Sequence, residues 1–463
     1  MQPYSLSPIR LIATLFLILI TTTGIASADP VIHWEIISGE YDDTRAFDIV
    51  QTDDGGYIIV GAAIHPREEG YQVPSPFYQA YIIRVTSTGE ILFEKTIDDE
   101  RTRAINAIIR TQDGTYAMAG SVSDPPDHDS DAYLARMDGD GTILWERTFG
   151  KEYYDSATDL VEVESGGFAI VGVTTKTNDY PHRDIYLIRT DDSGELLFEK
   201  NYGDRYTDVG HSIKATRDGG FIIAGDGAFS LIRTDEDGRV LWTRSLREPS
   251  DANSGIVTTP NAVVETSDGD FITAGTTLSK DGDTFTLHAS LTKIDQRGEI
   301  IWAKEYPGDG VSSFSSALLL ENGEITAVGE TSRPDPLGNP PISGESSIFL
   351  IRADQFGGPI IQTSIRRGEY SSGKALLITG NEFIIAGSIS EEREGYQEYD
   401  PMRYLTHAYA ASLSIDSDEK PVKEQSVPLL YAPVLALPFF IFSRRRRKTR
   451  EDNEEKNPPP SYF

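Results

Sequence analysis

The sequence predicts an all-β fold, a single seven-bladed β-propeller with four-stranded blades. The first observation is a short apolar segment that ends in glycine and occurs seven times, from GGYIIVG to NEFIIAG. The spacing of 50 to 59 residues between copies is typical of a propeller blade. The seven segments end at Gly61, Gly120, Gly172, Gly225, Gly275, Gly329 and Gly387.

The second observation is that each copy is accompanied by three more apolar stretches. In the first repeat these are FDIVQT before the glycine-rich turn, then YIIRV and ILFEK after it. Short stretches rich in Ile, Val, Tyr and Phe, bounded by Gly and Asp turns, are typical of strands. Outside the two terminal apolar runs no segment keeps a helical period. Because one four-stranded sheet cannot cover both of its faces, the blades must stack around an axis.

The third observation is that the two ends of the array complement each other. The last repeat stops at ASLSIDSD and lacks a fourth strand, whereas VIHWEIISG near the N-terminus resembles such a strand. We therefore predict that residues 31–36 complete the last blade and close the ring. The alternatives are an open solenoid, which would need distinct capping repeats, and two packed sheets.

Residues 1–28 have the form of a secretory signal peptide. Arg10 precedes the apolar run LIATLFLILI, and Ala26-Ser27-Ala28 forms a small-x-small cleavage site. An uncleaved anchor is the alternative. We expect the propeller, residues 29–416, to be exported and followed by a linker over 417–426.

A second apolar run, residues 427–443, is followed at once by the basic block RRRRKTR. It contains prolines and is shorter than the about 20 residues that a spanning helix prefers, yet a basic block after an apolar run is a stop-transfer signal. We predict one span at 427–443 in the cell membrane, with the propeller outside and residues 444–463 in the cytoplasm. A processed sorting signal is the alternative.

The composition restricts the partners. Asp and Glu number 73 against 42 Lys and Arg, which gives a net charge of −31. This excess argues against nucleic acid, because phosphates must be neutralised by basic side chains. The chain has no cysteine, so disulfides and thiolate chemistry are excluded. The sequence leaves the oligomeric state open.

The repeats act as an internal control, because a residue present in nearly every copy serves the fold. A basic residue recurs in the third strand of six repeats, and we expect it to form structural ion pairs with Glu94, Glu146 and Glu199 of the fourth strands. The turn aspartates, such as Asp191 and Asp235, are expected to shape tight turns. The recurring basic residues are Arg84, Arg136, Arg189, Arg233, Lys293 and Arg352.

The exceptions to the pattern gather in the connection between the second and third strands, which varies widely in length. We expect these connections to share one face with the links between blades, and long loops on a rigid scaffold are where binding usually occurs. The candidate residues of this ligand face are His65, Tyr71, Tyr180, His182, His211, His288, Tyr404 and His407.

One of these connections contains the sequence DHDSD. Asp127, His128, Asp129 and Asp131 are candidate ligands of a transition metal, if a neighbouring loop supplies a further ligand. Calcium is the alternative ion. Beyond these candidates we predict no cofactor.

The pattern DGG[YF]IxxG followed by LIRTDxxGxxxW resembles the secreted and surface repeat β-propellers of bacteria and archaea, over nearly all of residues 31–416. The resemblance implies a propeller on the surface of a prokaryotic, archaeal cell. The turn Asp235, Gly238 and Trp242 also resembles the tryptophan-docking motif of quinoprotein dehydrogenases, with a shorter Asp-to-Gly spacing. This likeness implies the blade geometry and not the cofactor.

We therefore predict a membrane-anchored, extracytoplasmic binding or interaction module. Its partner is an envelope polymer, a protein or a carbohydrate. An extracytoplasmic enzyme with a metal-assisted site on the loop face is the first alternative, and a structural envelope component is the second. The chain contains no nucleophile elbow, phosphate loop or H-E-x-x-H motif.

Overall fold

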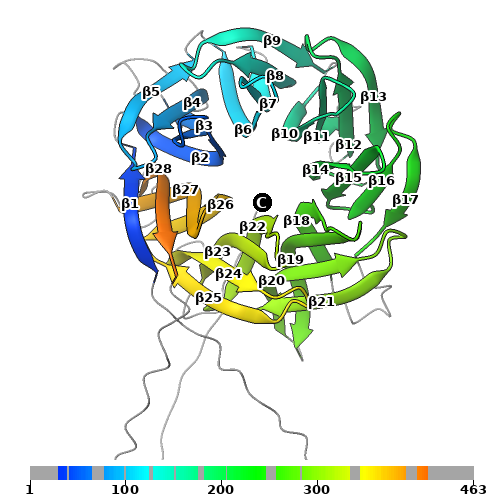
Figure 1. The fold of residues 1–463 in the computed structure, drawn as a ribbon. Helices are drawn as coiled ribbons and strands as arrows, with labels where there is room; N and C mark the ends of the chain where they lie inside the picture. Colours follow the sequence, from blue (N-terminus) through cyan, green and yellow to red (C-terminus); the bar gives the residue numbers. More distant parts are fainter. Residues whose placement is uncertain are drawn as a thin grey trace, which may run out of the picture. The chain divides into compact units, whose positions relative to one another are not determined.

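Strands β1 to β28 form seven four-stranded antiparallel sheets arranged as a ring (Figure 1). The structure is a computed structural model. It describes residues 30–38, 41–64, 78–97, 101–124, 129–150, 153–175, 182–204, 206–246, 257–281, 284–333, 345–392 and 404–415.

The first four blades follow the chain without interruption, and each runs from its innermost strand outwards. Their strands are β2 (Asp42–Gln51), β3 (Tyr57–Ile64), β4 (Tyr78–Val85) and β5 (Ile91–Ile97); β6 (Thr102–Arg110), β7 (Tyr116–Ser123), β8 (Asp131–Met137) and β9 (Ile143–Phe149); β10 (Asp155–Glu162), β11 (Phe168–Thr175), β12 (Arg183–Thr190) and β13 (Leu196–Tyr202); and β14 (Gly210–Thr216), β15 (Gly220–Gly225), β16 (Leu231–Thr234) and β17 (Val240–Arg244).

The last three blades repeat this order, except that the seventh takes its outer strand from the N-terminal end of the described chain. Their strands are β18 (Val257–Glu265), β19 (Phe271–Asp281), β20 (Thr284–Ile294) and β21 (Ile300–Tyr306); β22 (Val311–Leu319), β23 (Ile325–Ser332), β24 (Ser346–Ala353) and β25 (Pro359–Ile365); and β26 (Tyr370–Thr379), β27 (Glu382–Glu392), β28 (Tyr404–Ser414) and β1 (Val31–Ile37).

The closing strand β1 pairs antiparallel with β28, from Val31 opposite Ser414 to Ile37 opposite Tyr409. The prediction of seven four-stranded blades is confirmed, and so is the prediction that the N-terminal strand completes the last blade. The strand ends one residue beyond the predicted 31–36.

The repeated glycine marks a close approach between the two innermost strands of a blade. Gly172 of β11 lies opposite Ala157, next to a bulge in β10, and a Cβ at Gly172 would lie 1.9 Å from the carbonyl oxygen of Ser156. A side chain therefore cannot replace this hydrogen, which explains why the glycine recurs in every blade.

The core lies between neighbouring blades. One buried cluster combines Ala274 and Leu291 of blade five with Phe314 and Phe349 of blade six, and the rings of Phe314 and Phe349 stack with their centroids 5.6 Å apart. The two faces of a blade are covered by the preceding and the following blade, as the repeat pattern required.

In six of the seven blades an aromatic ring of the outer strand packs on a turn glycine of the next blade, and β25 carries an isoleucine at this position. Trp34 of β1 packs on Gly89 of blade one, and Trp242 packs on Gly298 of blade five. The indole of Trp242 also donates to the carbonyl of Gln296 at 2.9 Å. This is the blade geometry that the tryptophan-docking resemblance implied.

The predicted signal peptide, linker, membrane span and tail lie outside the described residues. Within the ranges given above, every regular element is a strand, and no helix there is long and apolar enough to cross a membrane.

Candidate functional site

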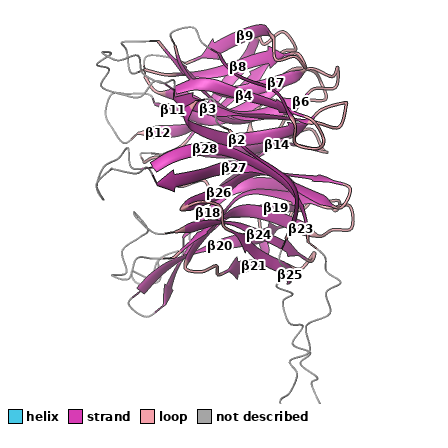
Figure 2. Cartoon of the chain, turned by 90° about the vertical axis from the view of Figure 1, so that its left-hand side faces the viewer, coloured by secondary structure: helices cyan, strands magenta, loops and turns pink. Residues whose placement is uncertain are grey.

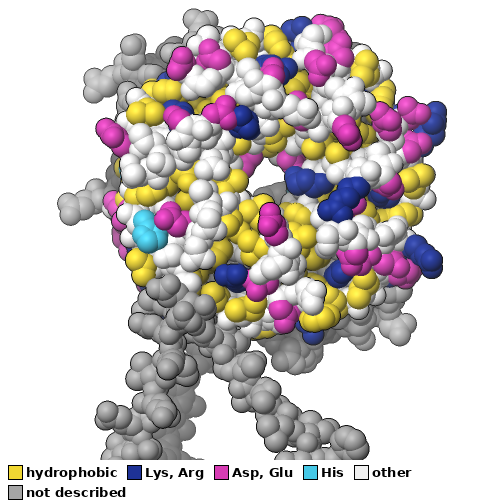
Figure 3. All heavy atoms as spheres, in the orientation of Figure 1, with side chains coloured by type: hydrophobic (Ala, Val, Ile, Leu, Met, Phe, Trp, Pro, Cys, Tyr) yellow, Lys and Arg dark blue, Asp and Glu magenta, His cyan; other side chains and the backbone are white. Residues whose placement is uncertain are grey.

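The ring has two different faces. On one face lie the short turns that join the first strand to the second and the third strand to the fourth. On the other face lie the links between blades, the end of each second strand and the start of each third strand (Figure 2). We call these the turn face and the link face. Figure 3 shows the ring in the orientation of Figure 1, with acidic side chains spread around the rim and several basic ones beside the central opening.

The turn face repeats one ionic clamp. In blade one, Thr52 Oγ1 donates to Asp54 Oδ1 at 2.6 Å, and the guanidinium of Arg84 donates to both oxygens of Asp54 at 2.6 Å. Arg84 is buried, and its hydrogen bonds together with that from Thr52 lower the pKa of the Asp54 carboxyl. The clamp fixes the turn between β2 and β3 to the third strand.

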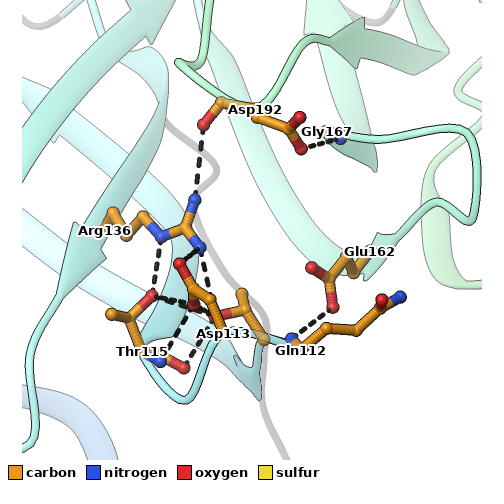
Figure 4. A network of polar contacts seen from close by, with 8 residues as sticks. Gln112, Asp113, Thr115, Arg136, Glu162, Gly167 and Asp192 are labelled. Atoms are coloured by element: carbon orange, nitrogen blue, oxygen red, sulfur yellow. Dashed lines mark hydrogen bonds and ion pairs between the residues drawn. The ribbon is translucent and has the colours of Figure 1, made fainter.

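The clamp of blade two also reaches blade three (Figure 4). Arg136 Nη2 donates to Asp113 Oδ2 at 2.5 Å, while Nη1 donates to the carbonyl of Asp192 at 3.4 Å. Asp192 in turn accepts from the backbone N–H of Gly167 at 2.5 Å. The clamp therefore joins neighbouring blades as well as neighbouring strands.

The recurring basic residues are structural, as predicted, but their predicted partners are wrong. They pair with acidic side chains of the turn between the first and second strands in Arg84–Asp54, Arg136–Asp113, Arg233–Asp218, Lys293–Asp268 and Arg352–Glu324. The reason is alternation along the strand: Glu94 lies opposite Ile83, and successive side chains point to opposite faces. Glu94 therefore faces away from Arg84 and accepts from the hydroxyl of Tyr81.

The turn aspartates shape turns, as predicted. Asp235 Oδ1 accepts from the backbone N–H of Arg239 at 2.7 Å, and Asp191 Oδ1 accepts from those of Ser193 and Glu195 at 2.9 Å. These bonds hold the tight turn between the third and fourth strands.

The link face differs from blade to blade. In each third strand one residue faces the repeated glycine, and the residue two positions before it lies toward the link face. In six blades this position is occupied by Gln79, Asp131, Asp184, His288, Ser347 or His407. Their contacts differ as well: His288 Nδ1 lies 2.8 Å from Glu305 Oε2, and His407 Nδ1 lies 2.8 Å from the carbonyl oxygen of Ser38. Burial, then the charges of Asp124 and Asp129, raise the pKa of Asp131.

The described candidates of the ligand face lie at or near the ends of strands in several blades. His182 is exposed before β12, His211 Nε2 lies 3.6 Å from Asp226 Oδ2, and the ring of Tyr404 meets that of Tyr370 edge-on at 4.8 Å. His288 belongs to blade five and His407 to blade seven. The structure does not bring these five into one pocket, and His65, Tyr71 and Tyr180 lie outside the described residues.

The metal prediction stays a prediction. Asp127 and His128 lie outside the described residues, whereas Asp129 and Asp131 lie inside them. Among the residues that the structure describes, no group of three or more His, Asp or Glu side chains could hold a metal ion.

A charged group on the innermost strands was missed. At one position of these strands six blades place Val, Ile or Leu, and blade four places Lys214, whose Nζ lies 3.1 Å from Asp159 Oδ2 of blade three. Asp48 of blade one interacts electrostatically with both. The exception was visible in the printed repeats, where HSIKAT stands beside NAIIRT and NAVVET.

Asp48 has a perturbed acidity. Its pKa is raised to about 7, chiefly by burial and also by the charge of Asp159, while hydrogen bonds from the backbone N–H groups of Ile108 and Ile49 lower it. The bond from Ile108 is 2.8 Å long and joins blade one to blade two. Asp159 likewise accepts from Ile213 N at 2.9 Å, so both carboxylates act as joints between blades.

The fold and these faces define a seven-bladed β-propeller. No family model matches the chain, and no curated protein matches it. Among solved structures it is similar to a virginiamycin B lyase from Staphylococcus aureus, with 13% identity, a TM-score of 0.48, and 81% of this chain and 98% of that chain covered.

Two further solved structures are similar to the chain. A streptogramin B lyase has 11% identity and a TM-score of 0.49 over 83% of this chain and 98% of that chain. YCF48 bound to D1 peptide has 12% identity and a TM-score of 0.45 over 85% and 98%. At these identities the likeness concerns the fold alone.

Proposed function

We propose that this chain is an exported propeller, held in the cell membrane by residues 427–443, whose link face binds an envelope or extracellular macromolecule. The observation that supports this is the contrast between the two faces. The turn face repeats the clamp of Arg84 and Asp54 in blade after blade, whereas the equivalent link-face positions carry side chains of different chemistry. Variation on a rigid scaffold is the usual arrangement of a binding surface.

The sequence supports the location. A signal peptide over 1–28 would export the propeller, and the basic block after residue 443 would stay in the cytoplasm. The net charge of −31 favours partners that are neutral or basic, because two acidic surfaces repel each other.

The test measures binding of the purified full-length chain to an extract of the cell envelope. On the link face, the pair Asp309 and Arg333, 3.8 Å apart, is exposed; on the turn face, the matched pair is Asp237 and Arg239, 2.6 Å apart. We expect saturable binding that Asp309→Asn with Arg333→Gln weakens and that Asp237→Asn with Arg239→Gln leaves unchanged. Absence of saturable binding, or a loss confined to the turn-face variant, would refute the proposal.

A further inference from the structure

A tyrosine–glutamate pair recurs near the link face of four blades. The residue that faces the repeated glycine is a tyrosine in blades one, two, three and seven. Its hydroxyl donates to a glutamate of the outer strand, in Tyr81–Glu94, Tyr133–Glu146, Tyr186–Glu199 and Tyr409–Glu35.

The tyrosine ring of the pair packs between its own blade and the preceding blade. Tyr133 belongs to the buried cluster that joins blades one and two, and Tyr409 to the cluster that joins blades six and seven. Both rings are at most 1% exposed. The glutamate satisfies the hydroxyl at the end of the ring, so the space is closed and its polar atoms are bonded.

Blade five lacks this pair. Ser290 lies opposite Gly275 and Ala303 occupies the position of the glutamate, two residues before the strand partner of Ser290. A cleft of about 380 Å³ opens at this place, and both residues line it. In blade six, Phe349 and Gln362 take the two positions, and a smaller cleft of about 270 Å³ opens there. Of the three blades that lack the pair, blades five and six each have a cleft at this place.

The wall of the blade-five cleft is rich in buried hydroxyl groups. Ser290, Thr277 and Thr292 are at most 5% exposed, and Thr277 Oγ1 lies 2.8 Å from Thr258 Oγ1. The hydroxyl of Ser290 has no hydrogen-bond partner among the described residues. A buried hydroxyl without a partner is unfavourable, and Ser290 is one of the residues that line the cleft.

The remaining lining combines apolar residues with Thr258, Lys304 and Glu305. Leu246, Ile300 and Ala303 line the cleft together with Glu305. The carboxylate of Glu305 accepts from Ser279 Oγ at 2.8 Å and lies 2.8 Å from His288 Nδ1. The cleft thus offers hydroxyls that donate and accept, apolar contacts, and one carboxylate that accepts.

From this cleft we infer that blade five binds a single neutral sugar ring, either free or as one residue of a glycan. A sugar ring has hydroxyl groups that donate and accept and C–H groups that pack on apolar side chains, which matches both parts of the wall. The cleft volume lies within the range of about 300–1,000 Å³ that is usual for small-molecule sites. The inference rests on the proposed binding role and adds the site and the class of ligand.

The experiment titrates the full-length chain with the methyl glycosides of glucose, galactose, mannose and N-acetylglucosamine, followed by saturation-transfer NMR and calorimetry. We expect saturable binding of at least one glycoside. Ser290→Ala removes one hydroxyl from the wall and should weaken it about fivefold to tenfold, the usual effect of one hydrogen bond.

The decisive variant combines Ser290→Tyr with Ala303→Glu, which rebuilds the pair of the other blades and fills the cleft. It should abolish glycoside binding while the thermal midpoint stays at or above that of the unchanged chain, which separates loss of the site from misfolding. The matched control combines Phe349→Tyr with Gln362→Glu in blade six and should leave binding unchanged.

The outcomes separate the two proposals. If no glycoside binds, or if the filled blade-five variant still binds it, the inference is overturned; the envelope-binding measurement then decides the proposed function by itself. If the filled variant loses both glycoside and envelope binding, the source is a glycan of the envelope. If it loses only the glycoside, the ligand is a free sugar and the inference stands apart from the envelope partner.

Discussion

The turn face and the link face are built from the same repeat. At the equivalent positions of the third strand, only the turn face carries the same kind of side chain in most blades. On the turn face, Arg84, Arg136 and Arg233 each reach an aspartate of the neighbouring turn. On the link face, the equivalent positions of the third strand carry an amide, a carboxylate, a hydroxyl or an imidazole. The difference indicates that the two faces have different roles: the side chains of the turn face stabilise the blades, whereas those of the link face can vary from blade to blade.

The scaffold shared by both faces should give the largest effect. In Gly172→Ala the new Cβ would lie 1.9 Å from the carbonyl oxygen of Ser156, so the two strands must separate. We expect a loss of about 4 kcal/mol in the free energy of unfolding, measured by urea denaturation of the full-length chain.

The matched control is Gly55→Ala. Unlike Gly172, Gly55 has a positive φ, 81°, but a Cβ there meets nothing within 4 Å, so only backbone strain of about 1 kcal/mol is expected. Equal effects of the two substitutions would contradict the close-approach explanation.

The turn-face clamp should come next. Arg233 is 5% exposed in its side chain, while its partner Asp218 is 73% exposed. In Arg233→Met the carboxylate of Asp218 is solvated by water instead, and the buried hydrogen bonds from Arg233 to backbone carbonyls are lost. We expect a loss of about 2 kcal/mol in the free energy of unfolding.

Arg239→Met serves as the control for the clamp, since Arg239 is 73% exposed and pairs with Asp237 at the surface. Its effect should stay within about 0.5 kcal/mol. The clamp would lose its assigned role if both arginine substitutions had the same effect in the same denaturation assay.

The joint at Asp48 should make stability depend on pH. Its pKa is raised from 3.8 to about 7 in the folded chain, so the folded state binds the proton more tightly than the unfolded state. Stability from this group is fully present below pH 4 and is lost as the pH rises through about 7. Asp48→Asn should flatten this part of the curve, measured as the thermal midpoint between pH 4 and pH 8. An unchanged slope would show that Asp48 does not titrate in this range.

The smallest effect on stability should come from the link face. His288 is 23% exposed in its side chain and pairs with Glu305, which is 39% exposed. We expect His288→Gln to change the free energy of unfolding by less than about 1 kcal/mol, measured by the same urea denaturation. An effect as large as that of Arg233→Met would remove the distinction between the two faces.

The fold could be predicted because its signals are local. The seven glycine-terminated segments, the turns after them and the unmatched strand at Val31 all lie within short windows of sequence. The partners of the arginines could not be predicted in the same way. Pairing Arg84 with Asp54 rather than Glu94 depends on which face of the strand each side chain takes, and that requires the register between strands.

The blade-five cleft is an intermediate case. In chain order, the residues that face the repeated glycine read Y, Y, Y, S, S, F and Y, and the outer strands lack the glutamate in the three blades without tyrosine. Each exception was visible in the sequence. Only the structure shows that Ser290 and Ala303 occupy corresponding positions beside one cleft, because that depends on the pairing of β20 with β21.

The closure of the ring by β1 also has a mechanical consequence. Strand β28 is hydrogen-bonded on both edges, to β27 on one side and to β1 on the other, and it is the last strand of the described chain. A pull that enters the propeller at Ile415 along the direction of β28 loads both ladders in shear, so many hydrogen bonds must break together rather than one after another. A ring closed in this way resists extraction of its final strand by force.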